Sequence, residues 1–174
     1  WAEIDVACLI KKAGHYVEFS SPKAPALNPD IIARIGGVRV NFETIYLQPP
    51  VGGKMQLTEV DRIKRAIDNK SRQLPLKERG VIVIYDKKVS VRDLHRLPKE
   101  AQGKLNKYPH VAAVIVVKEY ARGGTPEVEE EDTHVLCKDT FNDKYRRYTL
   151  MIKGLETSPS LISTLRAVLC PGLP

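Results

Sequence analysis

Two alternating runs of residues meet at a pair of glycines, and this pattern constrains the fold more than any other feature of the chain. Residues 30–35 and 38–45 each alternate between apolar and other side chains, and Gly36-Gly37 joins the two runs. Glycine adopts the positive φ angles that tight hairpin turns need. The pattern therefore predicts an antiparallel hairpin in which the residues flanking the two glycines face each other, and every other pairing follows from that register.

The remaining periodicities predict an α/β protein whose first elements follow the order α-β-β-β-α-β. Thr58 with Asp61 is typical of a capping box at a helix start, and two continuous apolar runs on either side of a further helix indicate buried parallel strands. Besides the hairpin, the expected elements are a helix over 3–13, a short strand at 17–19, a helix over 58–73, a strand over 81–85, a helix over 99–107 and a strand over 111–117.

The end of the chain predicts a second hairpin and a terminal helix. We expect strands at 133–137 and 148–152 and a helix over 160–169. A chain of 174 residues suits one domain with one sizeable core. The prediction is a single domain over 1–174, with a mixed sheet flanked by helices in a core over 3–117 and a C-terminal extension over 118–174.

Composition narrows the classes of function. The chain has 28 Lys and Arg against 21 Asp and Glu, a formal net charge of +7, which suits a polyanionic partner such as nucleic acid. Its three cysteines stand apart from one another, which argues against a zinc site and a disulfide framework, and no signal segment is visible, so we expect a cytoplasmic protein. The longest apolar run is too short for a membrane helix, and no membrane partner is expected.

The hairpin register brings two carboxylates together at the end away from the turn. Counting back along both strands sets Asp30 opposite Glu43. Cβ atoms that face each other across two strands lie about 5 Å apart, where two carboxylates repel by roughly 3 kcal/mol. A divalent cation such as Mg²⁺ or Mn²⁺ would remove this repulsion, since Mg²⁺ binds through one or two carboxylates. The alternative is a carboxyl group in solvent, or a longer turn that shifts the register.

A lysine falls on the apolar stripe of the helix expected over 58–73. Apolar side chains recur along this stripe from Val60 to Ile67, and Lys70 stands where another aliphatic residue is expected. Either the lysine stem lies along the core and its ammonium reaches water, or the ammonium contacts an anionic site. Gln73, at the edge of the same face, is either an ordinary solvated glutamine or a second donor to that site.

These residues resemble the motif of the PD-(D/E)XK nuclease superfamily, whose restriction-endonuclease-like fold has an α-β-β-β-α-β core. Pro29-Asp30 is similar to the PD half of the motif, and Glu43 with the two residues after it is similar to the (D/E)XK half. The similarity covers residues 3–85, about half of the chain. It implies that Asp30 and Glu43 bind Mg²⁺ or Mn²⁺, and that Glu3 on the first helix matches the additional acidic residue of some members.

Ile45 departs from this motif, which has a lysine two residues after the second acidic residue. Some members carry the lysine on the following helix, and Lys70 is the corresponding candidate here. The resemblance then implies metal-assisted phosphodiester hydrolysis, in which Asp30 and Glu43 hold the cation while Lys70 positions water or stabilises developing charge. The alternative is a scaffold that lost activity with the lysine and now binds nucleic acid or a protein without cleaving it.

A segment near the C-terminus combines basic and aromatic residues more densely than any other. Such a mixture can contact phosphates and stack bases, and a hairpin with solvent-facing arginines explains it equally well. The sequence thus predicts a nucleic-acid partner, with DNA favoured over RNA, and does not specify an oligomeric state. The candidate nucleic-acid-binding residues are Lys144, Tyr145, Arg146 and Arg147.

Overall fold

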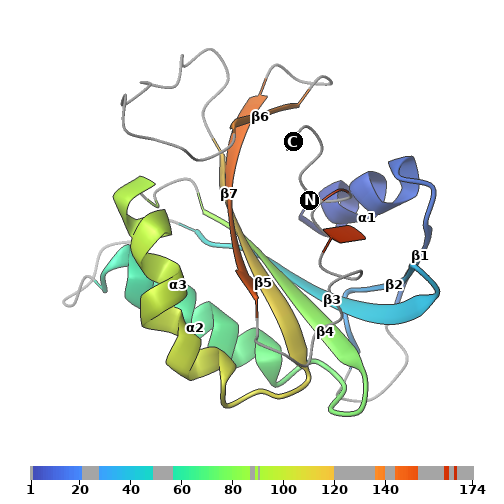
Figure 1. Ribbon diagram of the computed structural model, residues 1–174, viewed down its shortest axis with the longest axis horizontal. Helices are drawn as coiled ribbons and strands as arrows, with labels where there is room; N and C mark the ends of the chain where they lie inside the picture. The colour runs from blue at the N-terminus through green and yellow to red at the C-terminus, as the bar shows by residue number, and fades with distance from the viewer. Residues whose placement is uncertain are drawn as a thin grey trace.

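A seven-stranded mixed sheet forms the middle layer of the protein, with helices on both of its faces (Figure 1). The computed structural model describes residues 2–20, 28–48, 57–86, 89, 91–119, 136–139, 144–152, 163–164 and 167. In chain order the elements are α1 (Ala2–Lys12), β1 (Tyr16–Phe19), β2 (Ile31–Ile35), β3 (Val38–Tyr46), α2 (Glu59–Ser71), β4 (Arg79–Tyr85), α3 (Val91–Leu105), β5 (Val111–Glu119), β6 (Leu136–Asp139) and β7 (Lys144–Ile152). The strand order is β1-β2-β3-β4-β5-β7-β6. The predicted α/β class and the initial order α-β-β-β-α-β are confirmed.

The hairpin of β2 and β3 has the register that its two glycines predict. Ile35 pairs with Val38, and Ile31 pairs with Phe42 four residues further along each strand. Both turn residues have positive φ angles, 58° at Gly36 and 81° at Gly37. A side chain at either position would be strained, because L-residues other than glycine rarely adopt these angles. The turn therefore fixes which side chains of β2 and β3 share a face.

Strands β3, β4 and β5 run parallel, and α2 and α3 make the two crossovers between them. Helix α2 begins as its capping box predicts, since the Thr58 hydroxyl accepts a hydrogen bond from the Asp61 amide at 3.1 Å. Helix α3 corrects the prediction of a helix over 99–107, because it begins at Val91 and continues through Pro98. Leu97, one turn before Ala101, is fully buried, and this packing offsets the hydrogen bond that a proline removes.

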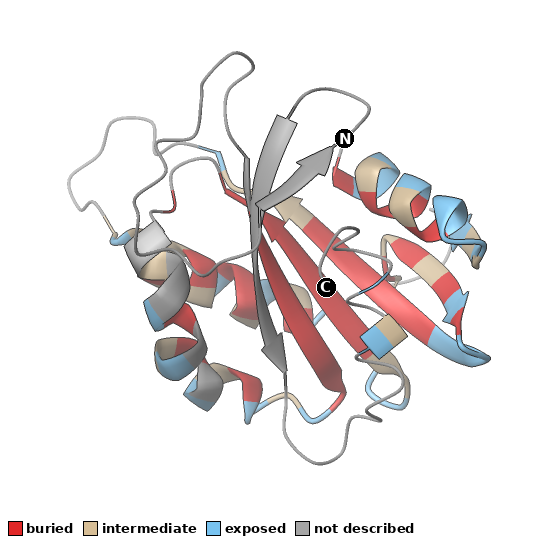
Figure 2. Ribbon diagram, turned by 45° about the horizontal axis from the view of Figure 1, so that its top comes forward, coloured by how far each residue is buried: buried red, intermediate tan, exposed pale blue. Residues whose placement is uncertain are grey.

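The two faces of the sheet carry separate cores. The first, here called the α1 core, joins α1 to one face of β2–β5, and the second, the α2–α3 core, joins α2 and α3 to the other face of the parallel strands. Figure 2 shows that buried positions run along most of β4 and β5, whereas exposed positions gather at the turn of the β2–β3 hairpin. Representative members of the α1 core are Val6, Ile10, Phe42 and Val83, and those of the α2–α3 core are Ile63, Ile67, Ile84 and Leu97.

The C-terminal hairpin is present with shifted bounds. Strand β6 pairs antiparallel with β7, where the sequence predicted strands at 133–137 and 148–152. Strand β7 also pairs antiparallel with β5, so antiparallel pairs flank the parallel strands β3, β4 and β5 on both sides of the sheet. The predicted terminal helix over 160–169 lies largely outside the described residues. In the part of the chain that the structure describes, no helix has the length and apolar character needed to cross a membrane.

Candidate functional site

Three of the sequence-predicted site residues meet where α2 crosses β3. Asp30 immediately precedes β2, Glu43 lies in the middle of β3, and Lys70 lies in the last turn of α2. The Lys70 ammonium donates a hydrogen bond to Glu43 Oε2 at 2.7 Å and lies 3.6 Å from Asp30 Oδ2. The structure therefore brings two carboxylates and one ammonium from three separate elements into direct contact.

Asp30 is held by the backbone of the neighbouring strand. Its Oδ2 atom accepts a hydrogen bond from the Thr44 amide at 2.7 Å and another from the Thr44 hydroxyl at 3.2 Å. This contact is possible because β2 begins only at Ile31, so the Asp30 side chain turns across the end of β2 toward β3. Thr44 stands inside the motif, but its residue type does not indicate this contact. A backbone amide contact leaves no signal in a residue pattern.

Lys70 takes the second of the two orientations that its position on the apolar stripe allows. Its neighbours on the stripe, Ile67 and Leu74, are fully buried, and the Lys70 side chain itself is only 16% exposed. The methylene stem follows the core, and the ammonium ends at the two carboxylates instead of in bulk water. The position of Lys70 on the buried stripe of α2 thus places its ammonium at the open end of the β2–β3 hairpin.

Glu43 is the most deeply buried member of the site. Its side chain is 1% exposed, and its Oε1 atom has no hydrogen-bond partner among the described residues. Burial raises the pKa of the Glu43 carboxyl and the negative charge of Asp30 adds to this effect, while the hydrogen bond and the charge of Lys70 oppose it. The combined effect is a pKa of about 7. The carboxyl is therefore balanced between its neutral and charged forms near neutral pH.

The donor set fits a hard divalent cation held by two carboxylates. Lys70 occupies only Oε2 of Glu43, so the buried Oε1 atom remains as an acceptor without a hydrogen-bond partner among the residues that the structure describes. Mg²⁺ commonly takes one or two protein carboxylates and completes its shell with water and phosphate oxygens. Within the described ranges, no group of three or more His, Cys, Asp or Glu side chains is arranged to hold a metal ion. Asp30 and Glu43 would therefore be its only acidic ligands in this part of the chain.

Ile45 lies on β3 two residues beyond Glu43 and carries no charge to the site. Its side chain is half-buried and packs against the α2–α3 core. The position that would hold the motif lysine is thus part of the hydrophobic packing, and the ammonium comes from α2 instead.

Two further predicted residues are not brought to the carboxylates by the described contacts. Glu3 lies in the first turn of α1, which packs on the opposite face of the sheet from α2. Gln73 follows the end of α2, and its side chain is exposed. The auxiliary roles of Glu3 and Gln73 stay predictions.

A second polar network, which no sequence pattern predicts, lies next to the site along β3. Asn41 is fully buried, and its amide nitrogen donates to Glu78 Oε2 at 2.7 Å. The same Glu78 oxygen lies 3.1 Å from Arg39 Nε. The Asn41 Oδ1 atom has no partner among the residues that the structure describes. The Asn41 Oδ1 atom is therefore a second buried acceptor, two residues along β3 from Glu43 and on the same face of the sheet.

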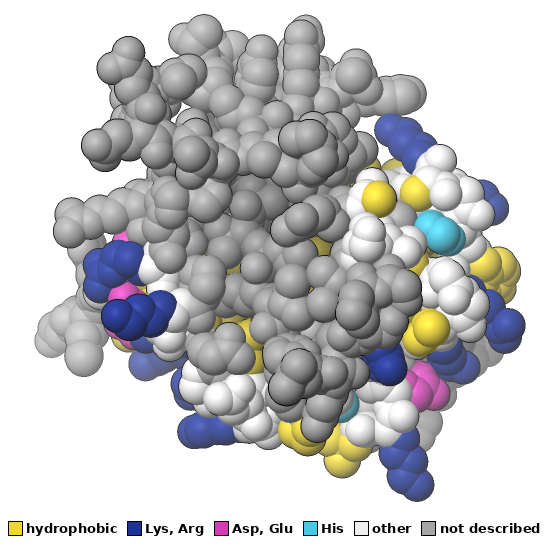
Figure 3. Space-filling model, in the orientation of Figure 1, with side chains coloured by type: hydrophobic (Ala, Val, Ile, Leu, Met, Phe, Trp, Pro, Cys, Tyr) yellow, Lys and Arg dark blue, Asp and Glu magenta, His cyan; other side chains and the backbone are white. Residues whose placement is uncertain are grey.

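The predicted nucleic-acid-binding residues lie on β7, but their side chains are outside the described part of the chain. Their backbones are placed: Lys144 pairs with Asp139, and Arg146 pairs with both Cys137 and Glu119. Figure 3 shows the described Lys and Arg side chains spread around the rim of one face of the molecule. Charge on this face therefore does not point to one binding surface.

Comparison with known proteins adds no family to this description. No protein-family description matches the chain, and no curated protein or solved structure matches it significantly. The functional interpretation consequently rests on the geometry of Asp30, Glu43 and Lys70.

Proposed function

We propose that the protein is a divalent-metal-dependent nuclease that hydrolyses phosphodiester bonds at the site formed by Asp30, Glu43 and Lys70. The observation that carries this proposal is the contact of the Lys70 ammonium with both carboxylates, at 2.7 Å from Glu43 and 3.6 Å from Asp30. A structural ion pair needs one carboxylate, whereas this ammonium serves two that repel each other. The resemblance of the motif to the PD-(D/E)XK nucleases supports the same assignment.

Each side chain has a separate task in this proposal. Asp30 and Glu43 hold Mg²⁺ or Mn²⁺, and Thr44 keeps Asp30 oriented through its amide and hydroxyl. A bound cation supplies Lewis-acid polarisation of the phosphate and lowers the pKa of water. Lys70 orients the attacking water or stabilises the charge that develops on the phosphate oxygens. The Oε1 atom of Glu43, which has no hydrogen-bond partner among the described residues, would be its ligand atom to the cation.

Lys70 takes the place of the motif lysine, which is absent at position 45. It can do so because the crossover between β3 and β4 brings α2 back over β3. Position 45 and position 70 are far apart in sequence, yet both belong to elements that border the carboxylates. A lysine on α2 therefore delivers the same charge to the same place from a different part of the backbone.

Nucleic acid is the proposed substrate class, with DNA favoured over RNA. The net charge of +7 supports a polyanionic substrate. Isolated cysteines suit the reducing conditions of the cytoplasm, where we place this activity.

A non-catalytic binding module on the same scaffold is the second candidate. Two observations favour it: Ile45 is part of the hydrophobic packing, and the Lys70–Glu43 contact can exist as an ion pair without a metal. In this alternative the carboxylates and the ammonium only hold α2 on the sheet, and nucleic acid or a protein binds elsewhere.

Metal-dependent cleavage by the wild-type chain separates the two candidates. Supercoiled plasmid, single-stranded DNA and RNA are each incubated with Mn²⁺ or with EDTA, using wild type, Asp30→Asn and the control Asp68→Asn. Asp68 is matched in exposure, 24% against 23% for Asp30, and contacts Tyr108 instead of the site. We expect Mn²⁺-dependent cleavage that Asp30→Asn abolishes and Asp68→Asn retains. No cleavage of any substrate, or equal cleavage by all three proteins, would overturn the nuclease assignment.

A further inference from the structure

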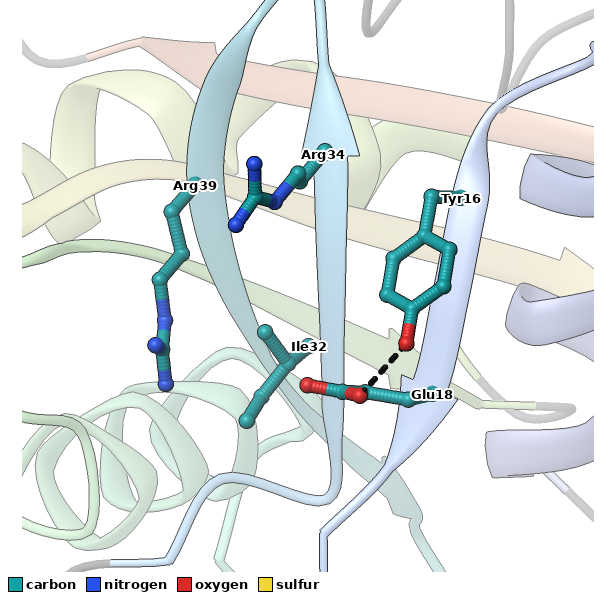
Figure 4. A pocket seen from close by; sticks show the side chains of 5 residues that line it. All are labelled: Tyr16, Glu18, Ile32, Arg34 and Arg39. Carbon is teal, nitrogen blue, oxygen red and sulfur yellow. Dashed lines mark hydrogen bonds between the residues drawn. The ribbon is translucent and has the colours of Figure 1, made fainter.

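The sheet face beside the carboxylates is open over β1, β2 and the start of β3. A shallow pocket of about 450 Å³ lies there and is lined by Tyr16, Glu18, Ile32, Arg34 and Arg39 (Figure 4). All five positions share the face of the carboxylates, because side chains alternate along β2 and Ala33 and Ile35 point into the α1 core on the other side. The pocket and the candidate active site therefore lie on the same face of the sheet.

The pocket holds a pair of like charges. Arg34 and Arg39 are direct partners in the β2–β3 register, and like charges in this arrangement destabilise a sheet. Arg39 is compensated by Glu78 at 3.1 Å. Arg34 is exposed and has no ion-pair partner among the described residues. The arrangement leaves one guanidinium, with its planar set of donors, available to an anion.

We infer that this pocket binds a phosphate group of a nucleic acid strand, with Arg34 as its principal donor. The Oε2 atom of Glu18 accepts a hydrogen bond from the Tyr16 hydroxyl at 2.7 Å (Figure 4), and no ion pair joins Glu18 to Arg34 in the part of the chain that the structure describes. Tyr16 is 55% exposed, and with Ile32 it offers an aromatic and aliphatic surface beside the charge. Such a combination of guanidinium and aromatic ring is suited to a strand whose phosphates and bases alternate.

The spacing along β2 relates the pocket to the proposed cleavage site. Arg34 is four residues from Asp30 on the same face, which corresponds to about 13 Å at a rise of about 3.3 Å per residue. Phosphates a few nucleotides apart on one strand span this distance, so a single strand can contact both the pocket and the site. This inference rests on the proposed function in taking the two phosphates to belong to one strand that lies along β2.

Binding without cleavage provides the test. Fluorescence anisotropy of a labelled 12-nucleotide single-stranded DNA is measured in EDTA at several salt concentrations, for wild type, Arg34→Gln and Lys107→Gln. Lys107 is an exposed lysine in the turn after α3, and its substitution removes the same charge. We expect Arg34→Gln to weaken binding about tenfold at low salt and to reduce the salt slope by about 0.7, the value for one lost phosphate contact on a single strand. Lys107→Gln should change both quantities little.

One further variant and one competitor make the outcome decisive. Arg34→Lys keeps the charge without the planar donor set and should bind with intermediate affinity, which also shows that the fold tolerates substitution there. Equal losses in Arg34→Gln and Lys107→Gln would overturn the inference, because they would reflect net charge alone. Inorganic phosphate that binds with Arg34 dependence while DNA affinity is unchanged would also overturn it, in favour of a free anion.

The proposed function and this inference fail separately. Since the assay contains no metal, Arg34-dependent DNA binding by a protein that never cleaves would retain the inference and reject the nuclease assignment. Mn²⁺-dependent cleavage with DNA binding that is indifferent to Arg34 would reject the inference alone.

Discussion

The β2–β3 hairpin carries a carboxylate pair at its open end and an arginine pair beside its turn, both on the same face. Asp30 and Glu43 lie under α2, where Glu43 is 1% exposed and the Lys70 ammonium contacts both carboxylates. Arg34 and Arg39 lie on the uncovered part of the sheet and are both exposed. Repulsion between like charges therefore occurs in the carboxylate pair, which is buried under α2, and in the arginine pair, which is exposed to solvent.

Burial decides what each pair requires. Removing the cation from a buried carboxylate leaves an uncompensated charge, which costs several kcal/mol or forces the group to bind a proton. Between exposed arginines, water and salt screen most of the repulsion, so the pair persists with a single partner at Glu78. We conclude that the buried carboxylate pair needs an internal cation or a bound proton, whereas the arginine pair is stable without an anion and free to bind one.

The largest expected effect is on catalysis by the buried pair. Lys70→Met keeps most of the volume of the lysine stem on the apolar stripe and deletes the ammonium that contacts both carboxylates. We expect the variant to fold and its rate of Mn²⁺-dependent cleavage to fall at least about a hundredfold, the usual cost of one transition-state donor. Lys64→Met is the matched control, since Lys64 lies on the same helix and contacts Glu100 instead. Full activity in Lys70→Met would show that the ammonium only packs.

The second prediction concerns pH, which should affect the stability of the buried pair. The pKa of Glu43 is about 7 in the folded protein, above its ordinary value of 4.5, so the folded state holds the proton more tightly. Its stabilising contribution is complete below pH 4.5 and is lost as pH rises through 7, by about 3 kcal/mol in total.

Glu43→Gln removes this titration and isolates its contribution. In urea unfolding from pH 4.5 to 8, the free energy of unfolding of wild type should fall relative to that of Glu43→Gln. A constant difference between the two proteins across this range would contradict the burial-raised pKa of Glu43.

The third prediction is that divalent metal stabilises the folded protein through the carboxylate pair. A ligand that binds only the folded state raises the free energy of unfolding by about 1.4 kcal/mol at ten times its Kd. Mg²⁺ or Mn²⁺ should therefore raise the Tm of wild type and not that of Glu43→Gln, and the increase should be greater at pH 8 than at pH 6 because the ligand must be charged. A Tm that does not change with millimolar metal at either pH would indicate that Lys70 and the carboxylates form an ion pair that does not bind metal.

The smallest expected effect tests the exposed pair. Glu78→Gln retains an oxygen that can accept from Asn41 but removes the charge beside Arg39. We expect a loss of about 1 kcal/mol or less at low salt, vanishing at high salt, as for other exposed charges. Urea unfolding with and without salt measures this loss. A large loss of unfolding free energy that does not depend on salt would show that Glu78 acts through buried hydrogen bonding. The arginine pair would then resemble the carboxylate pair more closely than its exposure indicates.

Local patterns explain why the sequence predicts the hairpin and the approach of Lys70. A two-glycine turn admits one register, which sets every pairing in β2 and β3. The capping box of α2 fixes where that helix begins, and the 3.6-residue period then places Lys70 on its buried stripe. These features depend on residues close together in sequence, and each has one low-energy geometry.

The features that the sequence did not reveal depend on distant contacts or on packing. Glu78 bonds Asn41 across 37 positions, and neither residue type signals the other. Helix α3 continues through Pro98 because buried residues on both sides hold it against the sheet, which overrides the local preference of proline. The Thr44 amide contact with Asp30 depends on where β2 begins, which periodicity locates only to within a few residues.

Relocating the lysine tests the central claim. This claim is that Lys70 on α2 supplies the positive charge that the motif lysine would supply from position 45 on β3. Mn²⁺-dependent cleavage of plasmid DNA is compared in wild type, Lys70→Met and the double variant Lys70→Met/Ile45→Lys, with folding checked by thermal unfolding. We predict cleavage by wild type, its loss in Lys70→Met and partial recovery in the double variant, because the ammonium then reaches the carboxylates from β3. Undiminished cleavage in Lys70→Met, or no cleavage by any of the three folded proteins, would contradict the account.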